Sequence, residues 1–422
     1  MPVVARSGGS LFFSKQSANA DVFIRDMTPF MWPSYRRTSL DMGGDHVATF
    51  TIDSTAHNVS VDILARWFDE WLGYHFEESY DRTVFQGQIY AMRFMFGGTV
   101  WSVTLDDMFN DVRVLYKAAS SGSVATVQTS DSTSIAQFGT KQEVIDAVIP
   151  GRPSRREHER SPKQQGENYM TSGAATQKRD KFLQLHKWPI VHTEDIAIGG
   201  IDDNASLEIE VRGYIHTLAW ARYKQTLVGA ADEDVDTHIG TLISGHEWIT
   251  SGTLASNTNQ VNNEGDYQDS LQRLDALVKD TDHSYRILSP DYAKIDYVSR
   301  DVTTIKYTRS MRGKYRGTLR ANGLVVPAPT ITPGGLVFLD DMFMAGRPDA
   351  VSGSEAKESA SGYPLNDPRY QWLAGVEYSA DGLILYTGEQ PTAARSAGAI
   401  ALATEAKNIR GGPGMIGPPS KV

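Results

Sequence analysis

The residues best suited to metal chemistry are two histidines and a glutamate in the segment DTHIGTLISGHE: His238, His246 and Glu247. Imidazole nitrogens and carboxylate oxygens are common zinc ligands. A helical metal pair places its two histidines at i and i+4, on one turn beside a general base, whereas these two are eight residues apart. The spacing argues against a metal site, and we predict none.

An acidic run precedes these histidines: Asp232, Glu233, Asp234 and Asp236. It lacks the glycine and the terminal glutamate of a calcium-binding loop, so a solvated helix start is the favoured interpretation.

Three other polar clusters contain carboxylates that acid–base chemistry can use: Asp106-Asp107, Asp202-Asp203-Asn204, and Glu377 with Asp381 near Tyr378. The first two lie at a strand corner and in a loop, where such side chains commonly accept hydrogen bonds from turn amides. For the third, the sequence does not give the separation of the two carboxylates in space.

Motifs with a strong mechanistic meaning are absent from the sequence. We find no Walker A motif, no GxGxxG at a strand–helix junction, no GxSxG and no HExxH. We therefore predict a protein that is not an enzyme, with no catalytic, cofactor-binding or metal-binding residues and no cofactor.

The composition narrows the class of protein further. Apolar residues make up 40% and charged residues 22% of 422 residues, which is typical of a folded chain of two or three domains. There is no cysteine, which excludes disulfides and thiolate sites. The net charge of −10 argues against general nucleic-acid binding. No window is apolar enough for a signal peptide or a membrane span, so we expect assembly in a cytoplasm.

One stretch, 150–168, has almost no apolar residues and cannot help to build a core. Its five basic residues are Arg152, Arg155, Arg156, Arg160 and Lys163. A nucleic-acid patch is one interpretation, but glutamates are interleaved and aromatic residues are missing, so a solvated mobile loop is favoured.

The fold is organised around Phe85–Tyr116, which reads as strand, turn, strand, Asp-rich corner and third strand. Gly97-Gly98 supplies the two positive φ angles of a two-residue hairpin turn. Three adjoining strands with one apolar face are enough to nucleate a sheet. The stretch therefore predicts the wall of a β-barrel or sandwich.

Further elements follow from periodicity. Ser60 is a predicted N-cap for a helix over Val61–Leu72, whose apolar stripe is Ile63, Leu64, Trp67, Phe68 and Trp71. Other helices are predicted over Thr140–Ile149, Ala174–Trp188 (with Phe182 and Leu185 inward), Val235–Ile243 and Ser270–Val278. Strands are predicted over Asp21–Arg25, Val47–Ile52, Leu207–Arg212, the segment YIHTLAWARY, Tyr285–Leu288, Lys294–Val298, Thr303–Tyr307 and Leu336–Leu339, with a strand or hairpin over Trp372–Tyr386.

These elements suggest six regions. They are an N-terminal arm (1–20), a first β-barrel domain with an inserted helix (21–117), a linker and helical insert (118–190), a second β-barrel domain with helices (191–345), a β insert or hairpin (346–387) and an extended C-terminal tail (388–422).

The order of features resembles a known family. After the helix, the chain follows the pattern F-x-G-x-I-x(15)-L-D-D-x-x-N-x-V-x-V-x-Y, carried by Phe85, Gly87, Ile89, Leu105, Asp106, Asp107, Asn110, Val112, Val114 and Tyr116. A helix ending at Trp188-Pro189 and a T-L-x-W-x-x-Y run (Thr217, Leu218, Trp220, Tyr223) come next. Over residues 20–300, this order resembles the tail-tip or baseplate hub proteins of tailed phages, which are built from tail-tube-like β-barrels.

The resemblance implies an α+β fold of mainly β structure, with two barrel or sandwich domains, inserted helices and extended terminal arms. It implies a structural virion protein that forms a ring, typically a homotrimer, joining the tail tube to the tip. Its partners would be further copies, the tube protein, other tail-tip or baseplate proteins and the tape measure. DNA would pass only transiently through the lumen.

Two other classes of function stay open. The 8 Trp and 18 Tyr residues suit a carbohydrate-binding or adhesion module, in which aromatic rings stack on sugars. A carboxylate pair on a β scaffold suits a glycan hydrolase. A response to glycans, or a hydrolysis lost on mutating one carboxylate, would distinguish these from a structural hub.

Overall fold

The computed structural model describes the chain in segments. These are residues 10–17, 20–26, 34–79, 83–148, 169–195, 204–225, 232–244, 246, 248–262, 265–278, 283–287, 294–299, 304–307, 318–321, 336–339, 370–379 and 382–388. Within them, no helix is long and apolar enough to cross a membrane.

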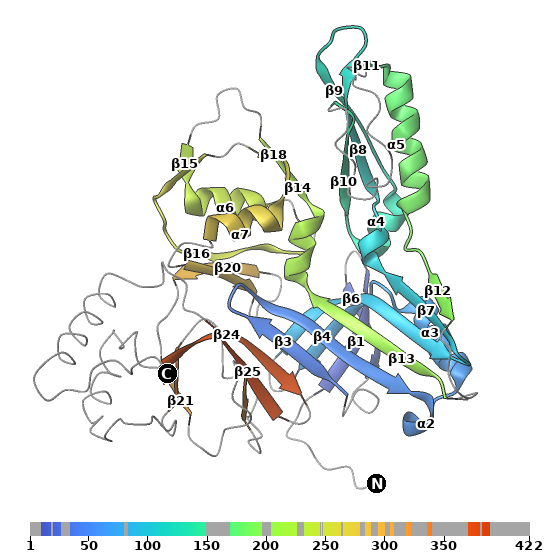
Figure 1. The fold of residues 1–422 in the computed structure, drawn as a ribbon, viewed down its shortest axis with the longest axis vertical. Helices are drawn as coiled ribbons and strands as arrows, with labels where there is room; N and C mark the ends of the chain where they lie inside the picture. Colours follow the sequence, from blue (N-terminus) through green and yellow to red (C-terminus); the bar gives the residue numbers. More distant parts are fainter. Residues whose placement is uncertain are drawn as a thin grey trace, which may run out of the picture.

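A central antiparallel sheet contains most of the core (Figure 1). Its strands pair in the order β2-β1-β5-β6-β13-β4-β3-β24. Their bounds are Ala20–Asp26 (β2), Ser10–Ser17 (β1), His75–Ser79 (β5), Thr83–Phe96 (β6), Ser206–Gly213 (β13), Gly43–Asp53 (β4), Arg36–Leu40 (β3) and Tyr370–Ser379 (β24). Strand β1 lies inside the stretch expected to be an extended arm.

Strand β13 differs from its predicted place. Its alternation of buried and half-buried residues is as expected, but it lies between β4 and β6, in the sheet of the first predicted domain. The predicted region for this strand is the second β-barrel domain, 191–345. Alternation along a strand reports which face is buried and carries no information about which strands flank it. The rest of the predicted division into domains stays a prediction.

The hairpin predicted within Phe85–Tyr116 is confirmed, but the third strand of that stretch is not where we expected it. Strand β7 (Thr99–Thr104) returns beside β6, with Gly97 and Gly98 at φ 60° and 82° in the turn. A 3-10 helix, η1 (Leu105–Asp107), then turns the chain away. The third strand, β8 (Asp111–Ala118), joins a separate sheet.

Two helices flank the central sheet, α2 (Ser54–His57) and α3 (Val61–Glu70). As predicted, the Ser60 side chain caps α3 by accepting a hydrogen bond from the Ile63 amide. Leu64, Trp67 and Phe68 are buried against the sheet, but Ile63 is 42% exposed, so its predicted place in the apolar stripe is wrong.

The separate sheet and two helices form an arm that rises from the central sheet (Figure 1). Here "the arm" means β8, β9 (Val124–Ser130), α4 (Ser132–Phe138), β10 (Gln142–Asp146), β11 (Tyr169–Met170) and α5 (Ser172–His186). Strand β9 pairs antiparallel with one side of β8, while β10 and β11 run parallel to the other. Helix α5 covers one face of the sheet.

Three predictions about the arm are wrong. The Ser/Thr-rich stretch expected to be a linker forms β9, since its β-branched residues favour extended backbone. The helix expected over Thr140–Ile149 is strand β10, whose pairing with β8 outweighs its weak helical pattern. In α5, Phe182 packs on the core of the arm as predicted, whereas Leu185 is 61% exposed.

A second lobe packs beside the arm (Figure 1). Helices α6 (Val235–Ile243) and α7 (Ser270–Val278) have the predicted bounds. Around them lie β14 (Arg222–Gln225), β15 (Asp232–Asp234), β16 (Thr250–Leu254), β17 (Gln260–Asn262), β18 (Gly265–Asp269), β19 (His283–Ile287) and β20 (Lys294–Ser299). The segment expected to be the β-structure YIHTLAWARY is the 3-10 helix η2 (Tyr214–Trp220) followed by β14.

The remaining strands are β12 (His192–Asp195), β21 (Thr304–Tyr307), β22 (Thr318–Ala321), β23 (Leu336–Leu339) and β25 (Gly382–Gly388). Strands β24 and β25 form the predicted hairpin. The α+β class with strands predominating is confirmed. The pairs among the described strands close no ring, so the expected barrels are open sheets in this part of the chain. The tail 389–422 lies outside the described residues.

Candidate assembly surfaces

The histidine considered as a metal ligand is committed to internal contacts. His238 is fully buried, and its Nδ1 lies 2.5 Å from Glu233 Oε1. Arg273 Nε donates to His238 Nε2 at 3.0 Å, so both ring nitrogens have protein partners. His246 Nε2 bonds to the Leu242 carbonyl at 3.1 Å, and Glu247 lies outside the described residues. Among those described, no group of three or more metal-ligating side chains gathers.

The other carboxylate candidates also have structural partners where the structure describes them. Asp106 accepts hydrogen bonds from the hydroxyls of Tyr90 and Thr104, and Asp107 lies 3.3 Å from His192. Glu377 accepts a hydrogen bond from the Tyr386 hydroxyl. Asp202, Asp203, Asp381 and the basic stretch 152–163 lie outside the described residues.

A buried ion cluster joins strands β3, β4 and β5, and we call it the Arg37 cluster. Arg37 Nε lies 2.6 Å from Glu78 Oε2, and its Nη1 lies 3.7 Å from Asp45 Oδ1. Tyr35 donates to Glu78 at 2.7 Å, and the guanidinium lies 4.0 Å from the ring centre of Tyr378 on β24. Burial lowers the pKa of Arg37, but the two carboxylates outweigh this and raise it. The cluster holds three strands and the C-terminal hairpin together.

A second polar cluster lies where the arm meets the central sheet. Lys141 is 6% exposed and donates from Nζ to the carbonyls of Leu105 at 2.5 Å and Asp106 at 3.0 Å. Burial, which disfavours the ammonium form, lowers the pKa of Lys141 to about 8. Burial likewise lowers the pKa of the neighbouring His216 to about 3. The amine lies 5.5 Å from the ring centre of Trp220. These groups fix the base of the arm.

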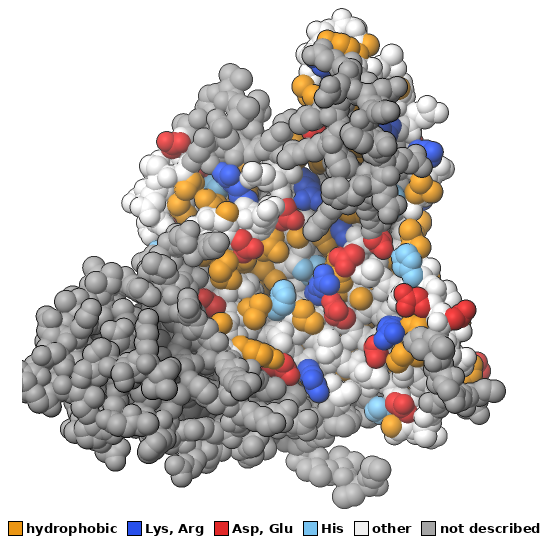
Figure 2. Space-filling model, viewed as in Figure 1, with side chains coloured by type: hydrophobic (Ala, Val, Ile, Leu, Met, Phe, Trp, Pro, Cys, Tyr) orange, Lys and Arg blue, Asp and Glu red, His pale blue; other side chains and the backbone are white. Residues whose placement is uncertain are grey.

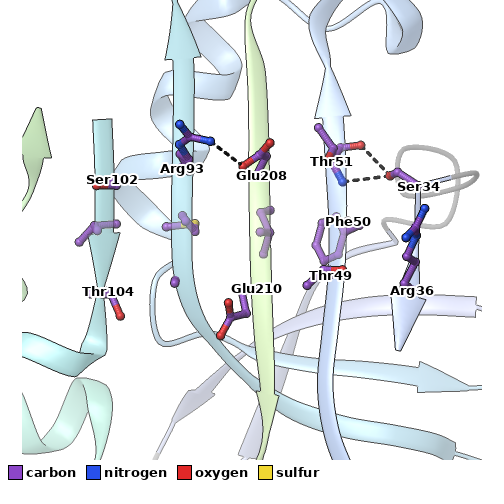
Figure 3. Close-up of a pocket in the computed structure, with 14 residues that line it drawn as sticks. Ser34, Arg36, Thr49, Phe50, Thr51, Arg93, Ser102, Thr104, Glu208 and Glu210 are labelled. Carbon is purple, nitrogen blue, oxygen red and sulfur yellow. Dashed lines mark hydrogen bonds and ion pairs between the residues drawn. The ribbon is translucent and has the colours of Figure 1, made fainter. Parts of the chain in front are cut away.

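The outer face of the central sheet carries a shallow hollow of about 620 Å³ (Figure 3). It spans β7, β6, β13, β4 and β3, and polar side chains from these strands project into it. Arg93 lies 3.5 Å from Glu208, and both side chains are about two-fifths exposed. Ser34 donates to the Thr51 carbonyl and accepts from its amide, each at 2.9 Å. The hollow is a polar, mixed-charge face.

Exposed apolar side chains concentrate on the arm and on the segment that leaves it. Of the eight large hydrophobic residues exposed in the described chain, six lie there: Val124, Tyr169, Leu185, Trp188, Ile190 and Val191. Orange side chains are visible at the top of the arm in Figure 2. Three of the six, Trp188, Ile190 and Val191, are neighbours along the chain, and contiguous exposed apolar surface on a soluble protein usually marks an interaction site. This is the first of two observations that point to assembly.

The second observation is an open strand edge along β9. The Ala118 amide donates to the Ser123 carbonyl, and the Asp131 amide to the Asn110 carbonyl, each at 2.9 Å. Antiparallel pairs alternate between bonded and non-bonded, so in the β8–β9 register the amides and carbonyls of Ala125, Val127 and Thr129 face β8.

By the same alternation, the amides and carbonyls of Val124, Thr126, Gln128 and Ser130 point to the outer edge of β9. No described strand pairs with that edge. Arg179 on α5 donates from Nη1 to the outward Gln128 carbonyl at 3.0 Å. Sequence reasoning missed this edge because the stretch was taken for a linker; the β-branched residues of VATVQT were the available signal.

A groove of about 600 Å³ runs between α5 and the β9 side of the arm. Thr129 contributes from β9, and Thr176, Asp180 and Lys181 contribute from the helix. A helix alongside an open strand edge is the arrangement in which some domains bind an extended peptide as an added strand.

A second open edge belongs to β12. All four of its residues are exposed, and it pairs antiparallel with β7 on one side only among the described strands. Glu194 and Asp195 give it an acidic end, and Trp188, Ile190 and Val191 immediately precede it.

Comparison with known proteins gives structural similarities only. No model of a protein family matches the sequence, and no curated protein sequence does. The 43 kDa tail protein of prophage MuSo2 from Shewanella oneidensis is similar at a TM-score of 0.40 and 8% identity, over 92% of this chain and 98% of that one. A tail protein from Neisseria meningitidis MC58 is similar at a TM-score of 0.40 and 9% identity, over 92% and 99%.

A third similar structure is the c3393 protein of E. coli, described as a component of the type VI secretion system with structural similarity to the T4 tail proteins gp27 and gp5. Its TM-score is 0.27 at 12% identity, over 48% of this chain and 64% of that one. The first two solved structures are described as tail proteins, and the third as similar to bacteriophage tail proteins. TM-scores of 0.40 and 0.27 are too low to carry an argument about function, so that argument has to come from the chain's own residues.

Proposed function

We propose that this protein is a structural component of a phage tail, a hub that forms a ring at the tip or baseplate and joins the tube to it. The observation that supports this best is the order of elements along the chain, which agrees with the family pattern although β8 joins a separate sheet. Along the chain, β6 leads through the Gly97-Gly98 turn to β7, then to the Asp-rich η1 and to β8. Helix α5 then ends before Trp188-Pro189, and β13 leads into Thr217 and Trp220 of η2.

The surfaces support an assembly role. The polar groups of the described sequence candidates serve internal contacts, while open strand edges and exposed apolar side chains face outward on the arm and β12. Exposed edges are a liability that proteins cover, and pairing between subunits is one way to cover them. The net charge of −10 suits a ring whose lumen conducts DNA without binding it.

The first test is the mass of the purified protein by light scattering, with negative-stain images of the same peak. We expect a closed ring of about three times 46.5 kDa with a central hole. Binding to purified tail-tube subunits is the second readout, and a particle lacking this protein should not join tube to tip. The proposal would be overturned if the protein is a monomer at every concentration and does not bind the tube protein.

A further inference from the structure

The open edges of β9 and β12 differ in the charge beside them. Beside β9, the groove under α5 is lined by the basic Lys181 and Lys187 and by one acidic residue, Asp180, and Arg179 reaches the Gln128 carbonyl. The β12 edge carries the exposed Glu194 and Asp195. Opposite charges on two edges favour their approach and fix the direction in which they meet.

We propose that these edges are the two halves of one contact between copies of this chain, in which β12 of one copy is added as a strand beside β9 of the next, along the groove under α5. The inference rests on the proposed function, because it names the surfaces through which the ring would close. The added strand supplies partners for the outward amides and carbonyls of Val124, Thr126, Gln128 and Ser130.

Arg179 is the residue that the incoming strand must displace. It lies 2.7 Å from Asp180 and donates to Gln128, so in a single copy it covers the middle of the open edge. When β12 of the neighbour takes the Gln128 carbonyl, the neighbour's acidic end offers the guanidinium a new carboxylate. The exchange keeps the charge paired throughout.

A second copy is the occupant that the chain's own surfaces favour. The two edges are different patches of one molecule, so their contact is head-to-tail and repeats around a ring if the rotation closes. The apolar side chain of Val124 on β9, and those of Trp188, Ile190 and Val191 before β12, are exposed in the single copy and add area to such a contact.

The absence of cysteine allows a direct test. Thr126→Cys and Thr193→Cys are made in separate full-length chains, mixed and mildly oxidised. Because Thr126 lies on the β9 edge and Thr193 on the β12 edge, and both are exposed, we expect a disulfide-linked dimer from the mixture. Gln128→Cys covers a register two residues along. The matched control mixes Thr126→Cys with Thr237→Cys, an exposed residue on α6 away from both edges, and should give no dimer.

The outcomes separate this inference from the proposed function. A ring by light scattering without any cross-link from Thr126 or Gln128 to Thr193 overturns the inference and leaves the hub proposal standing. Cross-linked copies that form open chains support the inference and contradict the ring. A protein that stays monomeric and does not cross-link overturns the inference as well.

A proline tests the backbone part of the contact. The Thr126 amide points away from β8, so Thr126→Pro should keep the β8–β9 pairing and the melting temperature. Loss of one intermolecular backbone hydrogen bond should weaken association about tenfold. Thr126→Val, which keeps the amide, should associate like the parent chain. Equal association of the two variants would contradict strand addition.

Charge reversal tests the partner. Lys181→Glu should weaken association, and Glu194→Lys on the other copy should restore it in the mixture. If Lys181→Glu has no effect, or if Glu194→Lys fails to rescue it, β12 is not the occupant.

Discussion

The central sheet and the arm use the same kinds of residue in opposite ways. In the central sheet, Arg37 and Glu78 are buried against each other, and Leu64 and Trp67 close the apolar face. In the arm, the basic residues of α5 lie at the surface, and Leu185 and Val124 are more than three-fifths exposed. The chain's own residues cover the Arg37 cluster and the apolar face of the central sheet, whereas the arm has apolar side chains that a partner would cover.

The difference separates side chains that stabilise the fold from side chains that are available to a partner. Satisfied polar clusters such as the Arg37 cluster hold strands in place. Strand edges without a paired strand and exposed apolar side chains are the features that a binding partner would use. Substitutions of the same kind in the two regions should therefore have very different consequences.

The largest expected effect comes from breaking the Arg37 cluster. Glu78→Ala removes one partner of a buried pair and should lower the free energy of unfolding by about 3–5 kcal/mol, measured by urea denaturation. Arg93→Ala breaks the exposed pair with Glu208 and should cost only about 0–1 kcal/mol. Similar decreases in the free energy of unfolding for both variants would mean that water reaches the Arg37 cluster.

A matched leucine pair compares the two regions directly. Leu64 is fully buried, so Leu64→Ala should destabilise the protein by about 2–5 kcal/mol. Leu185 is exposed, and Leu185→Ala should change stability by no more than about 0.5 kcal/mol. Association measured by light scattering should weaken only for Leu185→Ala in folded protein. A large loss of stability on changing Leu185 would show that the arm packs differently.

The smallest effect, about 2 kcal/mol, concerns Lys141 at the base of the arm. Its pKa is about 8 in the folded protein against 10.5 for the ordinary group, so between pH 8 and 10.5 the unfolded chain binds more protons. The free energy of unfolding should therefore rise by about 2 kcal/mol as the pH increases from 8 to 10, because the unfavourable buried ammonium is neutralised. Lys141→Met should lack this rise, and Lys178→Met controls for the loss of one charge. Parallel pH curves for the parent and Lys141→Met would contradict it.

Much of the local structure was predictable from sequence because it depends on neighbours along the chain. The Ser60 cap, the Gly97-Gly98 turn and the bounds of α6 and α7 are of this kind. What the sequence did not give was pairing between distant strands, such as β13 between β4 and β6, and β10 beside β8.

The assembly surfaces were the hardest part to predict. A strand edge is open when no other strand pairs with it. Pairing depends on the tertiary structure, so residue types along the strand do not predict an open edge. Leu185, placed inward by its helical spacing, is exposed because the face of α5 that packs on the sheet is formed by Ala175, Phe182 and Leu183. The His238–Glu233–Arg273 contacts required α6 and α7 to meet, which the spacing of His238 and His246 did not foretell.

The position of β13 also limits how early the central sheet can form during synthesis on the ribosome. Strand β6 ends at Phe96 and β13 at Gly213, so 117 further residues must be made before the strand between β4 and β6 exists. At about 5–20 residues per second, this takes roughly 6–23 s. Throughout that interval the nascent chain carries β4 and β6 without the strand that separates them, which is the period when a chaperone or a slowed ribosome would matter most.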